Sequence, residues 1–211
     1  MSDLLSIDEI NRLHNRIQEM ELSQEEKDRR SKLVDDFVEA IVPFFKYAKA
    51  AIEYSDDDDM DTWYYLFIEE CTDSYISVLD KNGLTSGKYA ERAENASKEI
   101  STTILNSYAD GKSLDDIFSE RKVATIAETE TNILSNARMD DEAKEAGYTK
   151  KTWVTMGDEK VRIAHALVDN VTIGIDDAFD VEGYAMKYPC DTSDNPDASL
   201  VVNCRCVCQY S

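Results

Sequence analysis

The stretch KKTWVTMGDEKVRIAHALVDNVTI, residues 150–173, decides the fold class because its hydrophobic pattern changes twice within a short span. The segment TWVTM at 152–156 alternates and is rich in β-branched side chains, which favours a strand. The segment at 158–169 has the pattern of a short helix capped by Asp158, and VTIGI at 171–175 is a second strand candidate. A strand, a helix and a strand this close together predict a small α+β module.

The sequence before this module has a helical pattern as far as about residue 140. Ser6 and Ser23 are each followed by a glutamate three residues later, a capping-box arrangement that predicts two helix starts. The helix after Ser23 should bury one continuous seam, with a kink or a break near Pro43. The seam residues, spaced by three and four, are Val34, Val38, Ile41, Phe45, Ala48 and Ile52.

Further helices are expected over about 60–79 and 86–109, and the acidic run DDDDMD at 56–61 is predicted to be a charged linker that caps the first of them. The predicted fold class is therefore α+β. A mainly helical arm or bundle covers 1–112, and a module covers 113–211. The module consists of a long helix, 113–140, and a small α+β unit, 148–211.

The charge balance limits the classes of partner. The formal net charge is −21, from 44 acidic and 23 basic residues, and such a field repels phosphate backbones and selects basic protein surfaces. No run approaches the roughly 18 to 20 apolar residues that span a bilayer, so we expect no membrane contact. The first ten residues lack the pattern of a signal peptide, which predicts use in a cytoplasm.

The five cysteines are concentrated near the end of the sequence, where VVNCRCVCQYS (201–211) has the alternation of a closing strand. On such a strand Cys204, Cys206 and Cys208 face one side. Three interpretations stay open: buried core thiols, a zinc site completed by His165 and Cys190, or a disulfide to Cys190. Reduced thiols are the default, since an odd number of cysteines is untypical of a disulfide scaffold.

The short helix at 158–169 would place Asp158, Arg162, His165 and Asp169 on one face. This stripe is either a catalytic edge with His165 as base, or an ion pair between Asp158 and Arg162 beside a structural histidine. Glu130 lies on the apolar seam of the preceding helix, where a carboxylate needs a partner. We expect it to accept from Arg162 or Arg205.

Several segments follow one another in the order of a known family. The matching positions are Ile126, Ala127, Thr129 and Glu130; Lys151 and Trp153; Asp158, Val161, Arg162 and His165; Phe179; Pro189 and Asp191; and Asn203, Cys204, Arg205 and Cys206. In this order they resemble the phage Mu F-like minor head proteins, over about the last ninety residues. Two positions depart from the family pattern. Glu128 replaces an arginine, and Cys190 replaces a glycine, which should force a different turn.

The resemblance implies a virion component that acts in head morphogenesis, associates with the portal or the inner capsid, and assists DNA packaging or ejection. It implies contact with portal or capsid proteins, and the long acidic helical arm is suited to binding such a partner. The resemblance assigns no reaction, so no catalytic residue and no cofactor are predicted. The alternative is an enzyme, a hydrolase or ADP-ribosyltransferase-like protein, that uses Asp158, His165 and Asp191 with Asn203. Weak contact with DNA is a third option, if Lys150, Lys151 and Lys160 form a basic patch.

Overall fold

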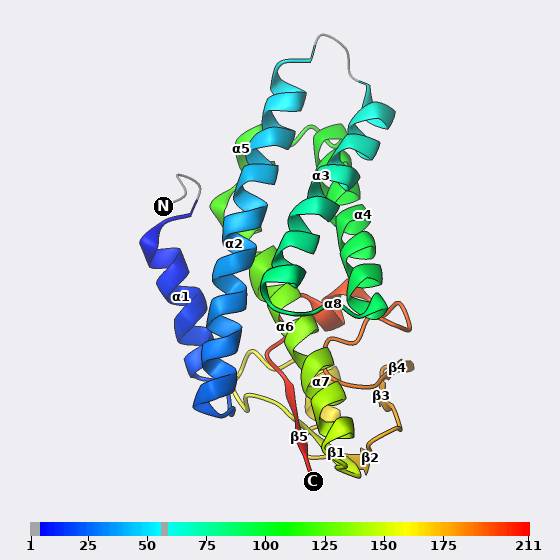
Figure 1. Ribbon diagram of the computed structural model, residues 1–211. Helices are drawn as coiled ribbons and strands as arrows, with labels where there is room; N and C mark the ends of the chain where they lie inside the picture. Colours follow the sequence, from blue (N-terminus) through cyan, green and yellow to red (C-terminus); the bar gives the residue numbers. More distant parts are fainter. Residues whose placement is uncertain (1–4, 56–58) are drawn as a thin grey trace. The chain divides into compact units, whose positions relative to one another are not determined.

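The computed structural model describes residues 5–55 and 59–211, so half of the predicted charged linker, at 56–58, lies outside the described residues (Figure 1). Contacts divide the chain into two compact units. The helical unit comprises the residues up to His14 together with Ser31–Ala127, and the mixed unit comprises Asn15–Arg30 and Glu128–Ser211. The predicted modules, 1–112 and 113–211, are defined by sequence rather than by contacts and stay a prediction.

Six helices make up the first two thirds of the described chain (Figure 1). They are α1 (Ile7–Gln18), α2 (Gln24–Glu53), α3 (Met60–Lys81), α4 (Gly87–Ala109), α5 (Leu114–Ile117) and α6 (Glu120–Glu145). The predicted caps are confirmed, because the Ser6 hydroxyl accepts from the Glu9 amide at 3.3 Å and the Ser23 hydroxyl from the Glu26 amide at 3.2 Å. Each satisfies an amide that the first helical turn leaves without a partner.

Apolar packing holds the helical unit together. All six residues of the predicted α2 seam are buried, and α3 lies beside α4. Helix α2 continues through Pro43, so the expected break there is wrong. The side chains on both sides of the proline, Val42 and Phe44, are buried, and this packing outweighs the one hydrogen bond that a proline removes.

The long helix predicted over 113–140 is two helices. Ser113 caps α5 and accepts from the Asp116 amide at 3.1 Å, but α5 ends at Ile117 and α6 starts at Glu120. Phe118 leaves helical geometry and buries its ring edge-on against Phe45, at 5.5 Å between ring centroids. The free energy gained by burying this ring outweighs the hydrogen bonds that a continuous helix would form.

The mixed unit contains the small antiparallel sheets that the α+β prediction requires, so the fold class is confirmed. Strand β1 (Lys150–Val154) is central, between β2 (Thr172–Gly174) and β5 (Val207–Tyr210). A hairpin that the sequence did not predict pairs β3 (Phe179–Val181) with β4 (Tyr184–Met186). Its two turn residues have positive φ, 54° and 88°, as tight hairpins of this type require.

Two local predictions in this unit are wrong. Helix α7 spans only Ile163–Leu167, and Asp158 lies in a turn before it, so the predicted four-residue polar stripe does not share one helical face. The closing strand starts at Val207, because Val201 ends the short helix α8 (Ala198–Val201) and Asn203 has a positive φ of 56°. Cys204 and Cys206 therefore precede the strand, and only Cys208 lies on it.

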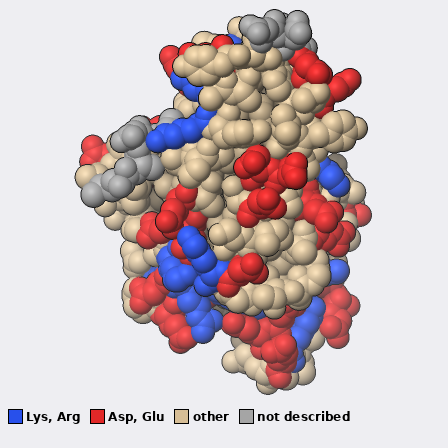
Figure 2. All heavy atoms as spheres, turned by 45° about the horizontal axis from the view of Figure 1, so that its top comes forward, with Lys and Arg blue, Asp and Glu red and all other residues tan. Residues whose placement is uncertain are grey.

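Acidic side chains are spread over the face of the molecule in Figure 2, with lysine and arginine gathered in fewer places among them. Over the described residues, no helix is both long and apolar enough to cross a membrane. The core of the mixed unit is formed around Trp153, Phe179, Val181 and Met186, together with four of the cysteines.

Candidate functional site

The segment Asn203–Cys206 is held in place by a buried polar network. The guanidinium of Arg30, which is 0% exposed, donates to Glu26 at 3.0 Å, to Asn132 at 3.0 Å and to Asn136 at 2.8 Å. Arg138 donates to the other oxygen of Glu26 at 2.5 Å. Burial lowers the pKa of Arg30, and the Glu26 carboxylate opposes that shift. The network ties the first turns of α2 to α6.

The two asparagines extend this network to the backbone of the cysteine segment. The amide of Asn132 donates to the Cys204 carbonyl at 2.8 Å, and the amide of Asn136 donates to the carbonyls of Pro189 at 2.8 Å and Cys206 at 3.1 Å. The site predicted from the sequence does not include these two asparagines. Their signal was present, since Asn132 and Asn136 are one turn apart on α6 and both amides need partners once that face is buried.

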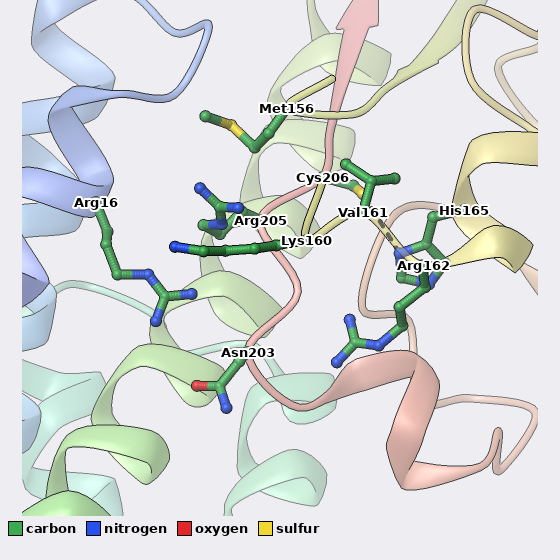
Figure 3. A pocket seen from close by; sticks show the side chains of 9 residues that line it. All are labelled: Arg16, Met156, Lys160, Val161, Arg162, His165, Asn203, Arg205 and Cys206. Carbon is green, nitrogen blue, oxygen red and sulfur yellow. Dashed lines mark hydrogen bonds between the residues drawn. The ribbon is translucent and has the colours of Figure 1, made fainter. Parts of the chain in front are cut away.

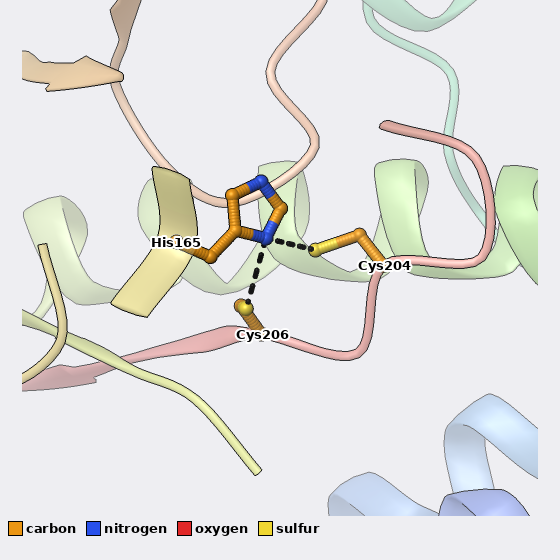
Figure 4. A group of neighbouring side chains, drawn as sticks. All are labelled: His165, Cys204 and Cys206. Atoms are coloured by element: carbon orange, nitrogen blue, oxygen red, sulfur yellow. Dashed lines mark hydrogen bonds between the residues drawn. The ribbon is translucent and has the colours of Figure 1, made fainter. Parts of the chain in front are cut away.

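The network positions two thiols against a buried histidine (Figure 4). Nδ1 of His165 lies 3.5 Å from Sγ of Cys204 and 3.4 Å from Sγ of Cys206. The three ligand atoms all lie within 4.8 Å of one another, and the three residues are at most 4% exposed. The histidine ring packs edge-on against Trp153, at 5.5 Å between centroids, which holds the imidazole in this orientation.

The two thiols of this cluster differ in acidity. Hydrogen bonds from Cys190 and Cys206 lower the pKa of Cys204 well below its ordinary value, and His165 adds to the effect. The hydrogen bond to Cys204, followed by burial, raises the pKa of Cys206. Cys204 is therefore the thiol that ionises first, beside the imidazole.

Cys190 and Cys208 lie outside this three-residue group among the described residues. Sγ of Cys190 lies 4.0 Å from the Val201 carbonyl and 3.9 Å from the Cys204 carbonyl. None of the five cysteines is part of a disulfide, so the disulfide alternative is not what the structure contains. Cys190 has a φ of 67°, which means that the loop keeps the glycine conformation and the expected different turn is wrong. Its thiol is buried in the core, and that burial holds the residue in this conformation.

A basic pocket of about 240 Å³ opens beside the cluster (Figure 3). Its nine lining residues are Arg16, Met156, Lys160, Val161, Arg162, His165, Asn203, Arg205 and Cys206. Four of them are cationic, and their side chains lie around the cavity in Figure 3. His165 and Cys206 therefore belong both to the cluster and to the pocket wall.

Carboxylates and carbonyls anchor three of the four cations. Arg205 donates to Asp158 at 2.5 Å, and the hydrogen bond from this guanidinium lowers the pKa of the Asp158 carboxyl. Arg162 donates to the Val202 carbonyl. Arg16 pairs at 2.8 Å with Glu128, the residue that replaces the family's arginine. The pocket keeps a positive wall while its arginines are held in position.

The predicted catalytic residues are not brought together. The Asp191 carboxylate accepts from the backbone amides of Lys187 at 2.9 Å and Ser193 at 3.0 Å, which makes it part of a loop. Asp158 pairs with Arg205, and the His165 ring faces thiols. The predicted lysine patch does not form, because Lys151 is 0% exposed and lies 3.5 Å from Asp140 in the sheet. Glu130 is buried, as expected, and its pairing with an arginine stays a prediction.

Comparison with known families decides the identity. The family described as "Phage Mu protein F like protein" matches residues 79–209, more than half of the chain. The chain belongs to the phage Mu protein F-like family. Neither the curated proteins nor the solved structures provided a match to this chain. Membership in the phage Mu protein F-like family, a family of phage structural proteins, suggests a phage head or morphogenesis protein.

The match contains α6 and the mixed region after it as far as Gln209, so the buried asparagines, the cysteine cluster and the pocket residues from Met156 onward lie inside the family region. Arg16 and Arg30 lie outside it. The segment before residue 79 therefore contributes one wall of the pocket and the centre of the polar network.

Proposed function

We propose that this chain is a minor head protein that enters the virion by binding the portal or the inner capsid, and that it assists DNA packaging or ejection. The family match over residues 79–209 carries this proposal. The net charge of −21 supports a protein partner with a basic surface rather than a broad grip on DNA.

An exposed apolar face in the mixed unit supports a specific docking surface. Ile163 and Leu167 are 81% and 75% exposed, and they lie one turn apart on α7. Val171, just after this helix, is 40% exposed. Large apolar side chains grouped on one face mark protein contacts more often than isolated ones do. We assign docking on the head to this surface, in place of the helical arm that the sequence favours.

The helical arm provides the natural comparison. Tyr54 and Tyr65 are 80% and 72% exposed in the helical unit, so a tyrosine double variant removes comparable exposed ring area from the arm. The Ile163→Ser/Leu167→Ser double variant should reduce co-purification with the portal protein of the same phage by at least about tenfold, as expected for loss of an apolar anchor. The Tyr54→Ser/Tyr65→Ser variant should bind normally.

The opposite result, with binding lost only in the tyrosine variant, would return docking to the arm. Failure of the unmodified chain to bind portal or capsid proteins, together with its absence from particles, would overturn the proposed function. If the chain instead binds DNA, its affinity should fall steeply between low and physiological salt, because phosphate contacts release counterions.

A further inference from the structure

We propose that His165, Cys204 and Cys206 form a site for a thiophilic divalent cation of the zinc class, with a fourth position that opens to the basic pocket. The inference rests on the geometry of the mixed unit and is independent of the proposed head function. It selects one of the three interpretations of the cysteines that the sequence leaves open, and it removes Cys190 from the set of ligands.

The distances within the cluster are those of ligands around one ion. Zinc binds thiolate sulfur at about 2.3 Å and imidazole nitrogen at about 2.0–2.1 Å, so at the tetrahedral angle the sulfur and nitrogen atoms lie about 3.5–3.6 Å apart. The two observed separations from Nδ1 of His165 are 3.5 Å and 3.4 Å. Thiols that only fill a core have no reason to converge on the nitrogen of one imidazole at this spacing.

Hydrogen bonding alone does not satisfy this arrangement. In either tautomer Nδ1 makes one linear hydrogen bond in the ring plane, as donor or as acceptor. Two Sγ atoms nevertheless point at it (Figure 4). A cation at the centre would accept a lone pair from all three atoms at once.

The ligands are held in place before any ion binds. The carbonyls of Cys204 and Cys206 accept from Asn132 and Asn136, and Arg30 holds both of these amides. The His165 ring packs against Trp153. Preorganised backbone and ring positions reduce the entropy that ligand ordering would otherwise cost.

The fourth ligand comes from the pocket side. Cys190 is absent from the lining of the cavity, whereas His165 and Cys206 both line it. Water or a small anion in the cavity would complete a tetrahedral set, and four neighbouring cations favour the anionic form. Binding releases the protons of the two thiols to solvent, so affinity should fall as the pH falls.

The test uses the full chain, purified with a tag that contains no histidine and without chelator, with zinc measured by mass spectrometry after desalting. The chain should carry about one zinc ion, and the Cys206→Ser and His165→Ala variants less than about a tenth of one. The matched control is Cys208→Ser, which removes a buried thiol outside the cluster and should keep about one ion.

A second measurement does not depend on how the variants fold. Cobalt(II) added to the chelator-treated unmodified chain should produce a near-ultraviolet thiolate-to-cobalt charge-transfer band. The Trp153 fluorescence should fall at the same time, because this ring lies 5.5 Å from His165. A folded chain that shows no cobalt band and takes up no zinc would overturn the site, as would a Cys206→Ser variant that binds zinc at the stoichiometry of the unmodified chain.

Discussion

The two units of this chain achieve stability by different means. The helical unit packs apolar seams, and its aromatic rings meet edge-on, as between Phe37 and Tyr75 at 5.0 Å or Phe44 and Phe67 at 6.3 Å. The mixed unit instead encloses polar groups: an arginine with no exposed area, two asparagines, a histidine and an aspartate. Apolar packing tolerates small losses, whereas a buried polar network requires every partner to be present.

This difference has a consequence for function. The polar groups of the mixed unit converge on one short segment, Asn203–Cys206, whose backbone they hold. Nothing comparable in the described part of the helical unit is aimed at a single loop. A network that a simple core would not need, directed at a cluster of potential ligands, is typical of a site whose geometry matters.

The largest expected effect is loss of the central arginine. Arg30→Ala removes the donor to one Glu26 oxygen and to the side-chain oxygens of two buried asparagines, and it should reduce the free energy of unfolding of the mixed unit by about 3–5 kcal/mol. Each unit contains one tryptophan, Trp63 or Trp153, so urea unfolding in a Trp63→Phe background reports on the mixed unit alone.

The control is a substitution of the neighbouring residue, Arg29→Ala. Arg29 makes exposed ion pairs with Glu25 and Glu142, so Arg29→Ala should change stability by less than about 1 kcal/mol. Equal losses from the two substitutions would contradict the view that the buried network organises the mixed unit.

A smaller effect is expected in the helical unit. Phe67 is 0% exposed, and its ring contacts Phe44 and Tyr47 edge-on. Phe67→Leu keeps the position apolar and should cost about 1–2 kcal/mol, monitored by Trp63 in a Trp153→Phe background. Tyr65→Leu, on an exposed ring, should be nearly neutral. If Phe67→Leu reduced the free energy of unfolding by as much as Arg30→Ala does, the contrast between the two units would be removed.

Alkaline pH should destabilise the mixed unit through the buried thiol of Cys208. Burial raises the pKa of the Cys208 thiol from its ordinary 9.0 to about 12. Above pH 9 the unfolded thiol loses its proton while the folded thiol keeps it, so the unfolded state binds fewer protons and stability falls as pH rises toward 12. The stability advantage of the unmodified chain over Cys208→Ala should be about 1.4 kcal/mol smaller at pH 10 than at pH 8. If the free energies of unfolding of the two proteins changed in parallel between pH 8 and pH 10, the thiol would not be buried.

The smallest effect distinguishes a strained loop from a helix. At Cys190, where φ is 67°, glycine should be more stable than alanine by about 1 kcal/mol, because alanine retains the strain and both lose the sulfur. At Cys71, inside α3, the alanine variant should instead be more stable than the glycine variant, by about the same amount. Chemical denaturation of the four variants provides both comparisons. If the alanine variant were more stable than the glycine variant at both positions, strain at Cys190 would be excluded.

The contrast also explains which features the sequence could predict. The α2 seam and the caps at Ser6 and Ser23 depend on local spacing, and they are confirmed. The resemblance to the family depends on a long ordered motif and is confirmed as well. The prediction that the closing strand covers Asn203 is wrong, because this residue adopts a positive φ that an alternating pattern does not reveal. The predicted start of α7 is also wrong, since the helix begins at Ile163 and Asp158 lies in a turn before it. Arg30 could not be linked to Asn132 from sequence, since more than a hundred residues separate them.

The most direct test of the central claim, that this chain is a minor head protein, is quantitative mass spectrometry of purified particles of the phage that encodes it. The proposed function predicts peptides from both units in intact heads, at low copy number relative to the major capsid protein. Complete absence from mature heads and from their assembly intermediates, in particles where the portal protein is readily detected, would contradict it.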